Sequence, residues 1–555
     1  MAMTSLRDVI VVAVTVTGCA STPAELPRVR FANAPPVMVV DDRRPVPKRP
    51  QVSRNLLDLD FVDRSVTGPI DRGLSLPLHR RARGVNALDD VPDSTWFTNR
   101  IGVRDMSPEE IASGPQEDEG PERHMPWTIR STKSGGTEIG FIMTDARGVK
   151  YGLAFDMAES PEVETGSAAV VNRLLWAFGY NVPDDRVAYV RREELLLAPD
   201  AKVTNTQGGR LRRLERRELD EKLAKVWHTP DGRIRVLASR WLSGDSLGGS
   251  PPSGVRRGDP SDRIPHQDRR DLRGQYPLFA WVENVDLVQA NFLDMWIASP
   301  QDPARRYVMH YMIDFGKGLG TIALTDRNIR AGKRYLFDWG EPGWTLGISP
   351  RPWGHDWAPP LTGVSPTFLA REFDPGAWRP NLPYAPFDAA DRFDMFWGTK
   401  KLARFTREQI RAAALAGRFS DPRTVEYLTD TLVARQRATE AYWYARVNPL
   451  DRFATGSAGL CFEDLAISAQ LATTEQTHYV LASYDRDERP VGRITLDAAP
   501  GGTTCTSSVK LAVAGDGYTI VKVTTSRPAF AGSTVVHLAR DPASGAWRVI
   551  GVLRN

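Results

Sequence analysis

The chain has 555 residues, 41% of them hydrophobic and 25% charged, which is the composition of an ordinary globular protein of roughly two to four domains. The formal net charge is only +4 and the basic residues are scattered, so the sequence gives no indication of a nucleic-acid-binding surface. A chain of this length and composition can bury a large hydrophobic core.

The first residues have the features of a targeting signal. Arg7 precedes an apolar run over 9–17 that is too short to span a bilayer. The sequence that follows, Val16-Thr17-Gly18-Cys19, resembles the lipobox of bacterial lipoproteins. This resemblance implies that Cys19 is diacylated and becomes the new N-terminus, and that Ala20 directs the protein to the outer membrane of a diderm host. An ordinary cleaved secretory signal is the alternative.

Residues 20–53 contain seven prolines and few periodic apolar positions, which predicts an extended tether between a membrane and the globular part. Apolar residues return without a clear period between Leu56 and Arg100. We interpret this second segment as an extension that packs on the first domain.

From residue 126 the pattern is strand, turn, strand. Strands are expected at Trp127–Ser131, Ile139–Thr144 and Val149–Asp156, and the first turn contains Gly135 and Gly136. Backbone N–H groups of such a glycine turn can approach phosphates. A plain hairpin accounts for two glycines equally well.

A helix is predicted after these strands. Ser160 is the expected N-cap and Pro161 the first helical residue. Gly179 is the expected C-cap, and the apolar face consists of Ala168, Val171, Leu174, Leu175 and Phe178.

A strand at Arg235–Leu242 leads to Ser243-Gly-Asp-Ser-Leu-Gly-Gly249, which matches both G-x-S-x-G and the G-D-S-L of lipolytic esterases. A nucleophile elbow requires a helix after the serine. The residues that follow, Ser-Pro-Pro-Ser-Gly254, cannot form one. We therefore interpret the segment as a hinge between two lobes.

The most informative stretch lies between residues 279 and 320. Asp286 and Asn291 are spaced D-x-x-x-x-N, two strand-like runs follow at Phe292–Ile297 and Tyr307–Ile313, and Asp314-Phe-Gly316 comes next. A hairpin between the two motifs would fold Asn291 and Asp314 back to one end of a pair of strands. Capping Asp and Asn residues arranged this way by chance are the alternative.

The order and spacing of these motifs resemble the catalytic loop and metal-binding triplet of protein kinases. The resemblance implies that Asp286 orients or deprotonates the acceptor, and that Asn291 and Asp314 hold Mg²⁺ against the phosphates of ATP. The strands and helix of residues 126–183 look like the small lobe of HipA-type and spore-coat-type kinases. In those proteins a strand lysine, paired with a helix glutamate, holds the nucleotide phosphates.

That lysine–glutamate pair is missing here. The expected lysine position is Ala154, and the expected acidic residue falls near Ala168. Lys150 lies on the same strand face, but four residues of strand span about 13 Å. Gly135, Gly136 and Lys150 remain as candidate nucleotide-binding residues. A nucleotide-binding pseudokinase and a weak kinase are therefore both consistent with the sequence.

The remaining segments are helical and then all-β. Thr406–Gln409 reads as a capping box, and Asp421-Pro422 opens a helix to about Val447. Six alternating runs predict an antiparallel sandwich or barrel in residues 457–555: His478–Tyr484, Gly492–Leu496, Ser508–Val513, Tyr518–Thr524, Thr534–Ala539 and Trp547–Leu553. Cys461 and Cys505 share this unit, and an oxidising compartment would join them in a disulfide.

We therefore expect an α+β protein, a two-lobed kinase-like fold with a C-terminal antiparallel β domain. The expected division is a signal at 1–19, a tether at 20–53, an extension and small lobe at 54–245, a helical large lobe at 246–450 and the β domain at 457–555. The expected function is Mg-nucleotide binding at the cell envelope, with a surface protein or glycan as partner. A structural lipoprotein that holds a partner is the alternative.

Overall fold

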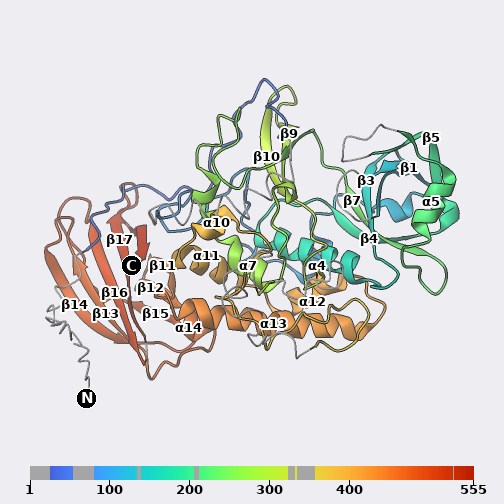
Figure 1. Cartoon of the computed structure of the whole chain (residues 1–555). Coiled ribbons are helices and arrows are strands. Elements are labelled where there is room, and N and C mark those ends of the chain that lie inside the picture. The colour runs from blue at the N-terminus through green and yellow to red at the C-terminus, as the bar shows by residue number, and fades with distance from the viewer. Residues whose placement is uncertain are drawn as a thin grey trace, which may run out of the picture.

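A computed structural model describes residues 26–53, 80–133, 139–204, 212–322, 332–333, 357–528 and 530–554. The fold is mixed α and β with several separate sheets, in agreement with the expected α+β class. Figure 1 shows a small sheet at one end, a central helical part with a β-hairpin above it in this view, and a β-sandwich at the other end.

The helices are α3 (Pro108–Ser113), α4 (Val163–Phe178), α5 (Arg216–Leu223), α6 (Arg270–Arg273), α7 (Gln275–Trp281), α10 (Ala385–Asp388), α11 (Arg392–Leu402), α12 (Arg407–Leu415), α13 (Pro422–Tyr444) and α14 (Leu465–Ser468). The strands of the first two sheets are β1 (Trp127–Thr132), β2 (Gly140–Thr144), β3 (Lys150–Phe155), β4 (Asp185–Val190), β5 (Leu195–Val203), β6 (Arg212–Arg213), β7 (Ile234–Arg240), β8 (Asp245–Gly249), β9 (Phe292–Ala298) and β10 (Arg306–Met312). The strands of the sandwich are β11 (Leu450–Gly456), β12 (Gly459–Asp464), β13 (His478–Tyr484), β14 (Pro490–Asp497), β15 (Thr503–Thr506), β16 (Thr519–Arg527), β17 (Phe530–Arg540) and β18 (Trp547–Arg554).

The small sheet has seven strands in the order β4-β7-β3-β2-β1-β5-β6. Side chains alternate between the two faces of the sheet along each strand, and each face packs against a core of its own. Leu153 of β3 faces a core shared with Leu219 and Leu223 of α5. Ala154, the next residue, faces the opposite side and packs against the core that contains α4.

Helix α4 begins later than the sequence predicts. Its first residue is Val163, and Ser160 does not cap it. The buried carboxylate of Asp156 does so instead, because its Oδ1 accepts hydrogen bonds from the backbone N–H groups of Glu164 and Thr165, each at 2.9 Å. The predicted C-cap is confirmed, since Gly179 follows the last turn with a φ of 142°.

The central hairpin consists of β9 and β10, which pair antiparallel over their whole length. Both strands lie where the sequence predicts them. β8 adds a third strand on the β9 side. The segment interpreted as a hinge, which contains Asp245 and Ser246, is therefore part of a sheet, because its backbone pairs with Trp296 and Met295.

The central part of the chain is built from helices that pack around α13. Thr406 and Gln409 form the predicted capping box at α12, and Asp421 caps α13 with Pro422 as its first residue. α13 ends at Tyr444, three residues before the expected Val447. In the ranges that the structure describes, every helix is too short or too polar to cross a bilayer.

The C-terminal unit is a sandwich of two antiparallel sheets. One sheet has the order β11-β12-β15 and the other β14-β13-β16-β17-β18. Leu460 and Phe462 of the first sheet share a core with Tyr479 and Val521 of the second. The predicted strand at Ser508–Val513 is wrong, because these residues lie between β15 and β16 and join neither sheet.

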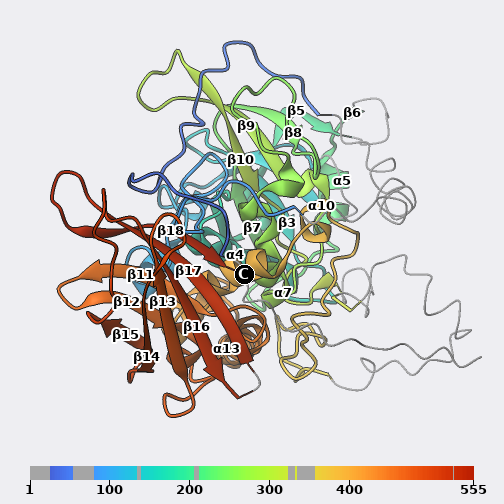
Figure 2. The same cartoon turned by 90° about the vertical axis from the view of Figure 1, so that its left-hand side faces the viewer.

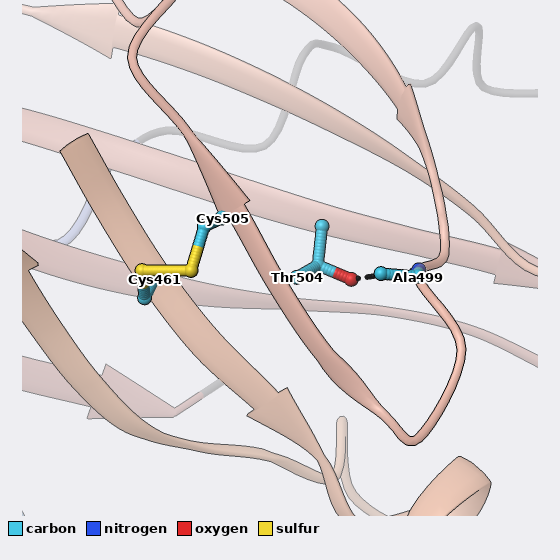
Figure 3. Close-up of a disulfide and its surroundings, with 4 residues drawn as sticks. All are labelled: Cys461, Ala499, Thr504 and Cys505. Atoms are coloured by element: carbon cyan, nitrogen blue, oxygen red, sulfur yellow. Dashed lines mark hydrogen bonds between the residues drawn. A yellow bond between two sulfur atoms is a disulfide. The ribbon is translucent and has the colours of Figure 1, made fainter. Parts of the chain in front are cut away.

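Cys461 and Cys505 lie side by side on neighbouring strands of the first sheet of the sandwich. They are directly paired residues of β12 and β15, and a disulfide joins them. Figure 3 shows this bond beside Thr504, whose hydroxyl accepts a hydrogen bond from the backbone N–H of Ala499. The disulfide links two strands that are 44 residues apart in the sequence.

Residues 26–53, here called the N-terminal strap, lie against the folded body, unlike the free tether expected for this segment. Phe31 packs on Gly551 of the sandwich and donates its backbone N–H to the Tyr518 hydroxyl. Val46 is buried with Leu247 and Val308 beside the hairpin. These apolar contacts hold the proline-rich segment against the body of the protein.

Candidate functional site

The hairpin brings Asn291 and Asp314 together. Phe292 and Met312 are the last paired residues of β9 and β10 at this end. One further backbone hydrogen bond, from Ile313 N to Asn291 O at 2.9 Å, continues the pairing beyond them. Asp314 therefore follows directly on a residue that is bonded to Asn291.

Asp286 is joined to the same end of the hairpin through the Asn291 side chain. The amide Nδ2 of Asn291 donates to the backbone oxygen of Asp286 at 2.9 Å and to its carboxylate at 3.2 Å. Asn291 is 8% exposed, whereas Asp286 is half-buried. Because both hydrogen bonds are made by Nδ2, the amide Oδ1 is turned away from Asp286.

The segment after β10 is held between α4 and the core. Phe315 is buried, and a side chain at Gly316 would meet Glu164 of α4, with its Cβ 2.9 Å from Glu164 Cγ. Asp314 has a φ of 64°, a left-handed conformation in which Asp and Asn are enriched. Its side chain is 41% exposed.

Lys133 supplies a cation to this site, and the sequence analysis did not identify it. Its Nζ lies 3.7 Å from Oδ2 of Asp314. Lys133 directly follows β1, about 180 residues before Asp314, and the two residues follow strands of different sheets, so the packing of these sheets brings the two side chains together. The sequence carries no local signal for this contact.

Lys150 lies at a different place. Its ammonium group sits 3.5 Å from the centroid of the Trp241 ring, and burial lowers its pKa below the usual value. Glu162, the residue before α4, accepts a hydrogen bond from the backbone N–H of Ser420. The other candidate residues, Gly135, Gly136 and Cys19, lie outside the described residues.

Ala154 and Ala168 occupy the positions where the resemblance expects a lysine and a glutamate. Ala168 is 1% exposed, and Ala154 packs against the same core. Two small apolar side chains therefore stand where the resemblance expects a charged pair.

Asp185, the first residue of β4, adds a buried carboxyl group near the site. Its pKa is raised to about 7, first by burial and further by the carboxylates of Asp184 and Asp314, against a hydrogen bond from Ser239. Because the folded state binds a proton that the unfolded state loses near pH 4, this group makes the fold less stable as the pH rises from about 4 to about 7.

A buried charge cluster fixes the two strands of the hairpin to the chain around them. Asp294 of β9 pairs with Arg256, and it bonds to Nδ1 of His310 on β10 at 2.6 Å. Burial raises the pKa of Asp294, but His310 and then Arg256 outweigh it and hold this pKa below its usual value. Trp96 stacks on His310 with the ring centroids 3.6 Å apart.

Asp314 and Asn291 have the ligand types that Mg²⁺ takes in nucleotide sites. Such a metal is held by one or two carboxylates and completes its shell with phosphate oxygens and water. Among the described residues, no group of three or more His, Cys, Asp or Glu side chains could hold a metal by itself.

A cavity of about 310 Å³ lies elsewhere, lined by residues that include Lys333 and Trp378, with the buried Glu283–Arg435 ion pair on its wall. It contains none of the predicted site residues. Comparison of the chain with protein-family models, with curated proteins and with solved structures finds no match.

Proposed function

We propose that this protein binds Mg²⁺ and a nucleoside triphosphate in a kinase-like cleft between the small sheet and the hairpin. The observation that carries the proposal is the grouping of Asp286, Asn291 and Asp314 at one end of the hairpin, through the hydrogen bonds of Asn291. Three residues from two separate motifs, two Asp and one Asn, thus lie together as phosphoryl transfer requires.

The topology of the small sheet supports the same proposal. Five of its strands run in the order β1-β2-β3-β7-β4, each antiparallel to its neighbour, and α4 connects β3 to β4. A kinase small lobe has this order with a helix in this place. β5, β6 and α5 form an insertion between β4 and β7.

Each residue has a separate role in this proposal. The Asp314 carboxylate and the Asn291 amide oxygen would hold the metal, which neutralises the phosphate charge when it is bound. The Asp286 carboxylate would orient an acceptor hydroxyl or take its proton. The hydrogen bonds from Asn291 to Asp286 keep the acceptor-binding and metal-binding groups in one arrangement.

The loss of charge at Ala154 and Ala168 argues for weak transfer or for none. A phosphate held mainly by metal is less well oriented for in-line attack, and orientation supplies much of the catalysis in phosphoryl transfer. The protein is thus proposed to be a nucleotide-binding pseudokinase or a slow kinase.

The test is the melting temperature of the purified protein with and without Mg²⁺ and ATP, followed by incubation with radiolabelled ATP. A ligand at a hundred times its Kd stabilises a protein by about 2.7 kcal/mol, which a thermal scan detects. Asp286→Asn should keep this shift and remove any label transfer, because its role is toward the acceptor. No shift in the parent protein would refute the proposal and leave the cleft as a relic.

We also propose that Cys19 anchors the protein to a membrane of the bacterial envelope, on the basis of its lipobox-like sequence. Cys19→Ala should move the protein from the membrane fraction to the soluble fraction, measured by fractionation of expressing cells. Ser5→Ala, a change elsewhere in the same segment, is the control. Membrane retention of the Cys19→Ala variant would contradict the anchor.

A further inference from the structure

A lysine outside β3 lies beside the place where the phosphate-binding lysine of a kinase would be. Lys133 extends β1 by one residue, since its backbone N–H donates to the carbonyl of Gly140 at 2.8 Å. Gly140 in turn is paired with Ala154 of β3. Lys133, Gly140 and Ala154 therefore form one row across three strands.

All three residues of this row face α4. Directly paired residues of neighbouring strands point to the same side of a sheet, and Ala154 packs against the core that contains α4. Neighbouring strands lie about 4.8 Å apart, so Lys133 is about 10 Å from Ala154 along the row. A lysine side chain that crosses β2 at Gly140 extends toward the α4-facing side of Ala154.

Gly140 is what allows the side chain to lie that way. A Cβ at this position would come within 3.0 Å of both Cβ and Cδ of Lys133. The aliphatic part of Lys133 therefore passes over the bare backbone of Gly140. Its ammonium group ends 3.7 Å from Asp314, the proposed metal ligand.

We propose that Lys133 is the phosphate-binding cation of this cleft and takes the place of the lysine missing at position 154. This inference rests on the proposed function. The ligand is the phosphate chain of a nucleoside diphosphate or triphosphate. In the structure Lys133 pairs with Asp314, and a bound Mg²⁺ would share Asp314 while phosphate oxygens would add to the contacts of the ammonium group.

The test compares Lys133→Met with Lys150→Met, two variants that remove a charge and retain most of the side chain. Dissociation constants are measured by calorimetry for MgATP and for adenosine. Lys133→Met should weaken MgATP at least about tenfold, the worth of one charge-assisted hydrogen bond, and leave adenosine unchanged. Lys150→Met should change neither, because its ammonium group lies over Trp241.

A second variant tests whether positions 133 and 154 serve the same place. Ala154→Lys in the Lys133→Met background should restore MgATP binding toward that of the parent. A folded double variant with an unchanged melting temperature and no restored binding would overturn the proposal.

The outcomes separate this inference from the proposed function. If the parent binds MgATP, Asp314→Asn abolishes binding and Lys133→Met does not weaken it, the assignment of Lys133 is wrong and the metal site stands. Equal weakening of MgATP and adenosine would mean that Lys133 only supports the fold, which also overturns the assignment. A parent that binds neither ligand refutes both.

Discussion

Replacing Asp314 by Asn is expected to abolish the rise in melting temperature that Mg²⁺ and ATP produce together. The metal is expected to offset more of the phosphate charge than the single cation Lys133, and Asp314 is the one carboxylate among the two proposed metal ligands. An Asn oxygen carries no charge and binds Mg²⁺ weakly. At a ligand concentration of a hundred times Kd, the variant should lose the ligand's contribution of about 2.7 kcal/mol to the free energy of unfolding.

The variant is suited to this test because Asn can adopt the same backbone conformation as Asp at position 314. Asp314 has a φ of 64°, and Asn is as tolerant of this conformation as Asp. Titration with EDTA gives the internal control, because the parent without Mg²⁺ should behave like the variant with it. A variant that still shows the full metal-dependent shift would mean that Mg²⁺ is held elsewhere.

Asp294→Asn is expected to lower the free energy of unfolding by about 3–5 kcal/mol, because it leaves the Arg256 guanidinium buried without its counter-ion. Asp294 and Arg256 are 0% and 3% exposed at their side chains. Urea denaturation at pH 7 measures the difference. Asp302→Asn, at the exposed tip of the same hairpin, should change stability by no more than about 0.5 kcal/mol.

The pH dependence gives an independent check of the Asp294 prediction. His310 and Arg256 hold the pKa of Asp294 below its usual value, so its stabilisation is present above about pH 4 and is lost as the pH falls through the folded-state pKa. The difference between parent and variant should therefore shrink below about pH 4. A constant difference at all pH values would show that lost packing is the cause.

Much of the site is predictable from the sequence because its geometry is local. Asp286, Asn291 and Asp314 flank two strands, and a hairpin returns the chain to its starting end whatever surrounds it. Helix ends were also predictable where short polar side chains cap them, as at Thr406 and Asp421. In these places a few neighbouring residues decide the conformation.

The rest depends on contacts between distant residues. Lys133 at the end of β1 and Asp314 after β10 belong to different sheets, and no short stretch of sequence encodes how these sheets pack together. The cap of α4 is provided by Asp156 at the end of β3, and not by the adjacent Ser160. The proline-rich strap folds onto the body because Phe31 and Val46 find apolar partners far along the chain.

The strap also limits how far the molecule can stand from a bilayer. Leu26 packs with Phe31 and Leu553 on the outer sheet of the sandwich, only seven residues after Cys19. Seven extended residues span at most about 25 Å. If Cys19 carries a lipid, the sandwich rests close to the membrane surface, and Figures 1 and 2 show the small sheet at the far end of the molecule. An acceptor or partner would then reach the proposed cleft from the aqueous side. The distance of this cleft from the membrane would be set by the length of the folded protein and not by a long flexible linker.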